Sequence, residues 1–351
     1  DATCDVHYYA ELEFGHAGHL DRIRFPEIDL GNDDPLTSAD ARRASPGVIG
    51  GPILEQGDAS FASVYGILRE AWIEYETSPY AIFRMGLIKT PTTRQLMTPP
   101  EMQQFVDIST ASAFIGQSMP GYTDRNRDYG FMVHGAFGCD AEWQYMVAVT
   151  NGDGVVHRNV LDGTTSDNFA YSARLNWDIK GHLGYEEGAL RSHECEWAAS
   201  VGVWAHFYAD HYQHNSFEKF ADRLVYGADA AFVWGGLSVT AAYNAFDFEP
   251  QSGDSLSGFS YLAQAGYLFP GTAWEVAARY AHYEIDDIPI GADEIGVAVT
   301  YYIDGHADKV TLDVAFLTGD DFGFIADFYA AYLPHFDSDA VLVRLQWQLA
   351  L

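Results

Sequence analysis

The chain has 351 residues, of which 48% are hydrophobic and 15% aromatic, yet it has no apolar run of the roughly 18 residues that a transmembrane helix requires. Its 19 basic and 50 acidic residues give a formal net charge of −31, which disfavours nucleic-acid binding, since that requires a basic surface, and favours cations as partners. Solvation and mutual repulsion of exposed loops would explain the same charge.

Alternation of apolar and polar residues predicts a chain built from β-strands. In the segment 168–178, one face carries Phe169, Tyr171, Ala173, Leu175 and Trp177, and the other face is mainly polar. The same test predicts fourteen strands, at 5–14, 67–77, 80–89, 129–137, 142–150, 168–178, 196–208, 223–234, 237–247, 258–269, 272–284, 293–303, 308–317 and 340–350. Most of these are close to the ~9 to 11 residues that cross a bilayer at a tilt.

The connections between these strands alternate in length. Short ones lie at 77–80, 138–141, 235–236, 269–271 and 304–307, and long ones at 15–66, 90–128, 151–167, 209–222, 248–257, 285–292 and 318–339. Tight periplasmic turns and long outer loops are typical of outer-membrane barrels. The connection 179–195 is an exception, because it is long where a short turn is expected.

These patterns predict an all-β fold: a single domain, 1–351, that forms a closed antiparallel transmembrane β-barrel in the outer membrane of a Gram-negative-type bacterium. Aromatic residues near the strand ends are typical of two interfacial girdles, for example Trp72, Tyr75, Trp143, Tyr145, Trp177, Trp197, Tyr267, Phe269, Trp274 and Trp347. Strand alternation alone would also fit a soluble β-sandwich. We expect lipid and lipopolysaccharide to surround the barrel.

Several segments, in order, resemble the phosphate-selective porin O and P family. They are LREAWIEY at 68–75, FRMGLIKTP at 83–91, RDYGFMVHG at 127–135, WEVAARY at 274–280 and VRLQWQLA at 343–350. The resemblance covers residues 60–351 and implies a channel of sixteen strands, usually a homotrimer, narrowed by a third loop that folds inward. Fourteen strands are visible, so the barrel has either sixteen or fourteen, and 15–66 is a long outer loop or insertion. The final Leu351 departs from the aromatic residue that usually ends such barrels.

The charge of the lumen would set the selectivity of such a channel. Strand parity places nine acidic residues inward: Glu11, Glu13, Glu70, Glu74, Glu76, Asp178, Asp229, Glu275 and Asp313. It places five basic residues there: Arg84, Arg174, Arg223, Arg279 and Arg344. Nine against five leaves four negative charges, which predicts a weak cation preference. Pairing between facing Glu and Arg residues would cancel that preference equally well.

The 39-residue connection 90–128 is expected to form the constriction, since a loop of this length without clear secondary structure usually has a function. Its apolar residues would be costly to leave in water: Leu96, Met97, Met102, Phe105, Val106, Phe114 and Ile115. A basic cluster predicts a local positive eyelet and consists of Lys89, Arg94, Arg125 and Arg127, with Arg84 below it. We expect a general or weakly cation-preferring channel for small polar or ionic solutes. An anion- or phosphate-selective channel with a basic eyelet is the alternative.

Other residue groups indicate further sites. His206, Asp210, His211 and His214 would suit a transition metal near the mouth, although mouth loops often carry histidine. Paired acids in outer loops would suit Ca²⁺, although solvated loop acids look the same: Asp33 and Asp34, Asp286 and Asp287, and Asp320 and Asp321. No other cofactor is expected.

All three cysteines map to the predicted periplasmic side, where Cys139 and Cys195 would be able to form a disulfide, with Cys4 left over. No GxSxG motif accompanies the scattered Ser and His residues, so an enzyme is not expected. A structural barrel that anchors a periplasmic segment remains as another class of function, and a lumen filled by protein would distinguish it.

Overall fold

The computed structural model describes residues 5–16, 64–117, 127–152, 169–190, 197–209, 220–250, 255–286, 290–319 and 339–349. Most of the predicted 15–66 insertion and the end of the 90–128 loop lie outside these ranges. Within the described ranges, no helix is long and apolar enough to cross a membrane.

Fourteen strands form one antiparallel sheet in chain order. They are β1 (Asp5–His16), β2 (Val64–Ser78), β3 (Ala81–Lys89), β4 (Arg127–Phe137), β5 (Trp143–Thr150), β6 (Ala170–Lys180), β7 (Ala198–Ala209), β8 (Phe220–Trp234), β9 (Leu237–Pro250), β10 (Leu256–Leu268), β11 (Trp274–Ile285), β12 (Ile290–Asp304), β13 (Asp308–Gly319) and β14 (Ala340–Leu349). The predicted fold class is confirmed. Many strands continue for two or three residues beyond the predicted end toward the long connections, because pairing keeps their backbone groups bonded.

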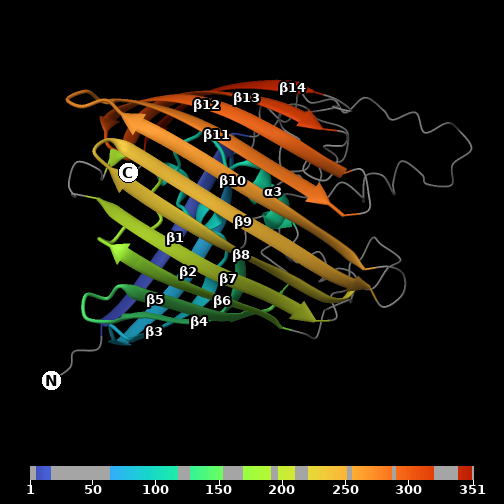
Figure 1. The fold of residues 1–351 in the computed structure, drawn as a ribbon. Helices are drawn as coiled ribbons and strands as arrows, with labels where there is room; N and C mark the ends of the chain where they lie inside the picture. Colours follow the sequence, from blue (N-terminus) through green and yellow to red (C-terminus); the bar gives the residue numbers. More distant parts are fainter. Residues whose placement is uncertain are drawn as a thin grey trace, which may run out of the picture.

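The sheet curls into a barrel whose order begins at β1 and ends at β14 (Figure 1). Tight turns lie at one end: Gly235 and Gly236, at φ 54° and 94°, join β8 to β9, and glycine adopts such angles without strain. At the opposite end, the connections 251–255 and 286–289 are shorter than predicted, since β9, β10 and β12 extend into them.

The outer face of the sheet is apolar. On β12, Val297 is 48% exposed, while the neighbouring Ala298 is buried. Aromatic side chains form two belts on this face. Near the tight turns, the ring centroids of Trp143 and Trp177 are 5.3 Å apart, and near the other end those of Tyr261 and Tyr280 are 5.8 Å apart. Apolar residues between two aromatic belts are typical of a barrel that faces lipid.

Two segments fold into the barrel. The first is the described part of the predicted constriction loop, 90–117, which contains α2 (Arg94–Met97), η2 (Pro100–Met102) and α3 (Thr110–Gln117). The expectation of a loop without secondary structure was therefore wrong. Ser109 precedes α3, and the backbone N–H of Ser112 donates to its hydroxyl at 3.2 Å, which caps the helix. The helix then packs inside the barrel, where Phe114 stacks on Tyr283 with centroids 4.5 Å apart.

The second inward segment, 181–190, follows β6 and belongs to the connection that broke the predicted alternation of lengths. Leu183 packs against Ala198 and Val233 on the inner wall, and Ala189 packs against Leu268 and Tyr302. We call this segment the inward turn, and 90–117 the inward loop. The connection after β6 is long because the inward turn lies inside the barrel.

Candidate functional site

The inner surface of the barrel has two unlike sides. One side, which we call the covered wall, comprises β6 to β14, and its ionisable side chains are buried although they face the interior. They are Arg174, Asp178, Arg223, Asp229, Glu275, Arg279, Glu294, Lys309, Asp313 and Arg344. The inward loop and the inward turn lie against this wall and exclude water from it.

One ion pair on the covered wall shows how the loop is held. Arg174 donates from Nη1 and Nη2 to the two carboxylate oxygens of Asp229, each at 2.7 Å. The carboxylate also accepts the backbone N–H of Arg94 at 3.0 Å, and Arg174 donates to the carbonyl of Thr92 at 2.6 Å. The pair therefore binds both a donor and an acceptor of the loop backbone.

Two more pairs repeat this arrangement along the loop. Arg279 pairs with Glu294, which accepts the backbone N–H of Thr110 at 2.7 Å. Arg344 donates to Asp313 at 2.8 Å, and Asp313 accepts the backbone N–H of Val106 at 3.0 Å. An arginine partner together with a backbone hydrogen bond offsets the desolvation cost of burying a charged carboxylate. Three such pairs fix the loop to the wall.

A glycine makes room for the first of these pairs. Arg174 on β6 and Asp229 on β8 meet across β7, where Gly202 lies opposite Asp229 in the strand register. A Cβ at Gly202 would lie 2.4 Å from Nη2 of Arg174. A side chain at this position would displace the guanidinium from Asp229, so glycine permits the close approach of the pair.

The other side of the interior is the inner face of β2 to β5, which we call the lane. Here Arg84 donates from Nε to Glu74 at 2.8 Å, and His134 shares a hydrogen bond of 2.9 Å with the same carboxylate oxygen. The guanidinium of Arg84 lies 3.9 Å from the ring centroid of Trp72. Glu76 and Met146 are half-buried nearby.

Exposure separates the lane from the covered wall. The side chains of Glu74, Arg84 and His134 are 12%, 22% and 17% exposed. The six side chains of the three covered pairs are 0 to 5% exposed. Both sets belong to inward-facing strand positions, so the inward segments produce the difference. Among the described inward-facing side chains, Glu74, Arg84 and His134 are therefore more accessible to water than the covered pairs, although Ile88, Met132 and Ala148 on the same strands form a buried apolar cluster.

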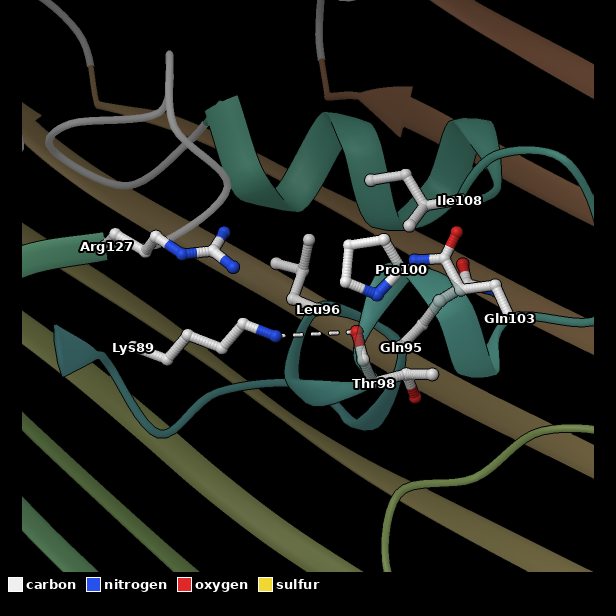
Figure 2. Close-up of a pocket in the computed structure, with 8 residues that line it drawn as sticks. All are labelled: Lys89, Gln95, Leu96, Thr98, Pro100, Gln103, Ile108 and Arg127. Carbon is white, nitrogen blue, oxygen red and sulfur yellow. Dashed lines mark hydrogen bonds between the residues drawn. The ribbon is translucent and has the colours of Figure 1, made fainter. Parts of the chain in front are cut away.

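The lane narrows toward the long connections. Arg127 at the start of β4 is buried and donates from Nε to Glu70 at 3.1 Å. Lys89 at the end of β3 donates to the carbonyls of Met97 and Thr98 at 3.3 and 3.5 Å. Figure 2 shows Lys89 and Arg127 beside a small cavity of about 10 Å³, which is also lined by Gln95, Leu96, Thr98, Pro100, Gln103 and Ile108.

The predicted basic eyelet is only partly assembled. Lys89 and Arg127 line one cavity, but Arg84 binds Glu74 in the lane and Arg94 lies beside Asp229 on the covered wall. Arg125 lies outside the described residues. Burial lowers the pKa of Arg94; Asp229 opposes this shift and Arg174 adds to it. Arg84 and Arg94 are held apart by their contacts with Glu74 and Asp229, and the sequence does not reveal these partners.

The predicted lumen residues Asp178, Arg223 and Glu275 are buried on the inner face, whereas Glu11 and Glu13 lie in β1, whose side chains fall outside the described part of the chain. Arg174 with Asp229, Arg279 and Asp313 with Arg344 are described above, and Glu275 accepts a hydrogen bond from Tyr302 at 2.6 Å. Sequence analysis missed Glu294, the partner of Arg279, although the parity of Ile295 and Val297 would have placed it inward. It also missed Glu187, for which a polar, glycine-containing turn gives no signal.

Of the four predicted metal ligands, only His206 is described. His206 lies on the inner face of β7, where its Nδ1 shares a hydrogen bond of 2.7 Å with the hydroxyl of Ser172. His206 is buried at this position. Asp210, His211 and His214 lie outside the described residues. Within the described part of the chain, no three His, Cys, Asp or Glu residues are grouped as metal ligands.

Two further predictions fall mostly outside the described ranges. Cys139 is free and exposed in the turn between β4 and β5, while Cys195 lies outside, so their disulfide stays a prediction. Of the paired loop acids, Asp286 is described and accepts the hydroxyl of Ser257 at 2.6 Å. Calcium binding by these loops also stays a prediction.

Comparison with known proteins identifies the fold. No family model matches the chain, and no curated protein matches it. Among solved structures, OprB of Pseudomonas putida matches with a TM-score of 0.53 and 10% identity, over 81% of this chain and 73% of that one. An anion-selective porin from Comamonas acidovorans matches with a TM-score of 0.50 and 14% identity, over 80% and 73%. OmpT of Vibrio cholerae matches with a TM-score of 0.50 and 9% identity, over 81% and 78%. The chain therefore has the β-barrel fold of outer-membrane porins.

Proposed function

We propose that the protein is an outer-membrane porin through which small polar or ionic solutes diffuse passively, with little or weak preference for cations. The observation that carries this proposal is the lane along β2 to β5. There Glu74, Arg84 and His134 remain accessible at 12 to 22% of their side-chain surface, while the opposite wall is sealed by protein. A polar path inside an apolar outer face is the arrangement that a diffusion channel requires.

The outer face supports a location in the outer membrane of a Gram-negative-type bacterium. Apolar residues such as Val297 lie exposed between two aromatic belts, where lipid and lipopolysaccharide would cover them. The family resemblance adds a homotrimer to this proposal. Native mass spectrometry of the detergent-solubilised protein tests it, and a monomer at all detergent concentrations contradicts it.

The distribution of charge supports weak selectivity. On the covered wall, three arginines are each neutralised by one carboxylate. In the lane, Glu74 neutralises Arg84, and Glu76 adds a half-buried carboxylate outside that pair. Since Glu70 pairs with Arg127 and Lys89 is opposite in charge to Glu76, the lane residues named here carry little net charge, which favours weak selectivity.

Swelling of proteoliposomes in isotonic solutions of small sugars and amino acids tests passive diffusion. We expect swelling whose rate falls as the solute becomes larger, without saturation. A barrel that anchors a periplasmic segment is the competing function, and the protein that fills one side of the lumen favours it. Absence of swelling with a correctly folded protein supports the anchor and contradicts the channel.

An anion-selective channel is the second candidate, and the phosphate-selective family that the sequence resembles is its strongest form. The cavity beside Lys89 and Arg127 favours it, because two cations stand there with Glu70 as the acidic partner of Arg127. If this cavity controls selectivity, Lys89→Gln will shift the reversal potential toward cations. An unchanged reversal potential removes this candidate.

A further inference from the structure

The inward turn is hydrogen-bonded to the inward loop inside the barrel. We propose that the inward turn is a second constriction element and that Glu187 is the positioning residue that holds the inward loop in place from the turn end. This inference rests on the proposed porin function and adds to it an element that limits the size of the pore from the end of the barrel where the tight turns lie. The geometry of Glu187 and Tyr185 carries it.

Glu187 binds the inward loop through its backbone and its side chain. Its backbone N–H donates to the carbonyl of Met102 at 3.0 Å. Its carboxylate accepts the side-chain amide of Gln95 at 3.0 Å on one oxygen and the backbone N–H of Gln104 at 3.0 Å on the other. The side-chain amide of Gln264, on the wall strand β10, donates to that second oxygen at 3.1 Å. Glu187 is 2% exposed, so one buried carboxylate joins turn, loop and wall.

Tyr185 joins the same three parts two residues earlier. Its hydroxyl accepts hydrogen bonds from Arg174 Nε at 3.1 Å and from the Asn176 side-chain amide at 2.8 Å. The guanidinium groups of Arg94, from the loop, and Arg174, from the wall, lie 5.6 and 5.4 Å from its ring centroid. Arg94 also donates to the carbonyl of Gly184. Both charged groups thus lie within cation–π range of one turn residue.

These contacts make the turn and the loop depend on each other. Without the Glu187 carboxylate, the amides of Gln95, Gln104 and Gln264 lose a buried acceptor, which is costly unless the segments move apart to admit water. Such a movement would widen the passage beside the lane. A carboxylate that only stabilised the fold would lower the melting temperature without changing the size limit of the pore.

Single-channel recording in planar bilayers, with polyethylene glycols of graded size to measure the polymer cut-off, tests the proposal. Glu187→Ala removes every side-chain acceptor, and Glu187→Gln keeps one acceptor oxygen. The matched control is Glu186→Gln, which makes the same charge change on the adjacent residue, whose carboxylate lies 3.2 Å from His306. A further variant replaces 181–190 by two glycines, which removes the inward turn and shortens the connection to β7.

We expect conductance to rise by roughly twofold for Glu187→Ala, less for Glu187→Gln and most for the shortened turn, with a larger polymer cut-off in the same order. Glu186→Gln should match the wild type. The proposal is overturned if both Glu187→Ala and the shortened turn keep the wild-type conductance and cut-off. If Glu187→Ala does not fold, Glu187→Gln and the shortened turn decide. A wild-type protein that conducts no ions contradicts the porin function itself.

Discussion

The covered wall and the lane are built from the same kind of strand and carry the same kind of ion pair, yet they differ in access to water. Arg174 and Asp229 on the covered wall are sealed beneath the inward segments, while Arg84 and Glu74 in the lane remain partly exposed. The alternation of the strands places both pairs inward. The inward loop and the inward turn decide which pair stays accessible, because they bury the pairs of the covered wall and leave Arg84 and Glu74 partly exposed.

The largest expected effect is on stability and separates the two sides directly. Arg174→Met leaves Asp229 buried without its partner, which should cost about 3 to 5 kcal/mol of unfolding free energy. Arg84→Met changes a partly solvated pair and should cost about 1 kcal/mol or less. Urea unfolding in lipid vesicles measures both. Equal losses would mean that the lane is as well sealed as the covered wall.

The second effect tests whether the outer face behind the covered wall contacts lipid, so that the two sides differ in access to water only on the inner face. Val297 lies on the outer face of β12, behind the covered wall. Val297→Arg puts a charge toward lipid and should cost about 2 to 4 kcal/mol near the bilayer midplane. Val297→Leu is the matched control and should change little. A tolerated arginine in vesicles would contradict a lipid-facing position.

The third effect is on selectivity. Replacing Glu74 and Glu76 together by glutamine removes two carboxylates from the lane, so the reversal potential in a salt gradient should move toward anion preference. Glu275→Gln makes the same chemical change at a buried position of the covered wall and should leave the reversal potential near the wild-type value. A larger shift from Glu275→Gln than from the double variant would mean that the pathway runs along the covered wall, which contradicts the account.

The smallest effect concerns a turn outside the lumen. The backbone N–H groups of Glu142, Asp140 and Cys139 lower the pKa of the Glu142 carboxyl below its usual 4.5. Because the pKa of Glu142 is lower in the folded protein than in the unfolded chain, its carboxylate stabilises the folded turn at pH values above the unfolded pKa. This stabilisation is lost as the pH falls through the folded pKa. Wild-type protein should unfold at slightly higher urea than Glu142→Gln at neutral pH, with the difference vanishing in acid. A difference that grows in acid would reverse the sign of the shift.

The strands were predictable because the alternation of apolar and polar residues along each strand shows which residues face inward and which face outward. The segment 168–178 alternates strictly, and β6 spans Ala170–Lys180. The inward position of 90–117 was also predictable, since residues such as Phe114 have no other apolar surroundings available. Its helices were not, because α3 is short and its sequence, TASAFIGQ, is held by the wall more than by its own helix propensity.

The contacts between segments far apart in the chain could not be predicted from the sequence. Arg174 and Asp229 are 55 positions apart, and their pairing depends on strand register and on Gly202 between them. Glu187 lies in GHLGYEEGAL, which reads as an ordinary polar turn. Its partners Gln95 and Gln264 are 92 and 77 positions away. Local patterns predict which way a residue faces, whereas pairing needs the three-dimensional arrangement.

Cysteine accessibility tests the one-sided lumen most directly. In a protein whose own cysteines are replaced by serine, Met146→Cys introduces a thiol in the lane, and Thr311→Cys introduces one at a buried inward position of β13. A charged, membrane-impermeant thiol reagent should modify Met146→Cys and reduce its single-channel conductance, while Thr311→Cys keeps its conductance. Block of Thr311→Cys with an unaffected Met146→Cys would contradict the account.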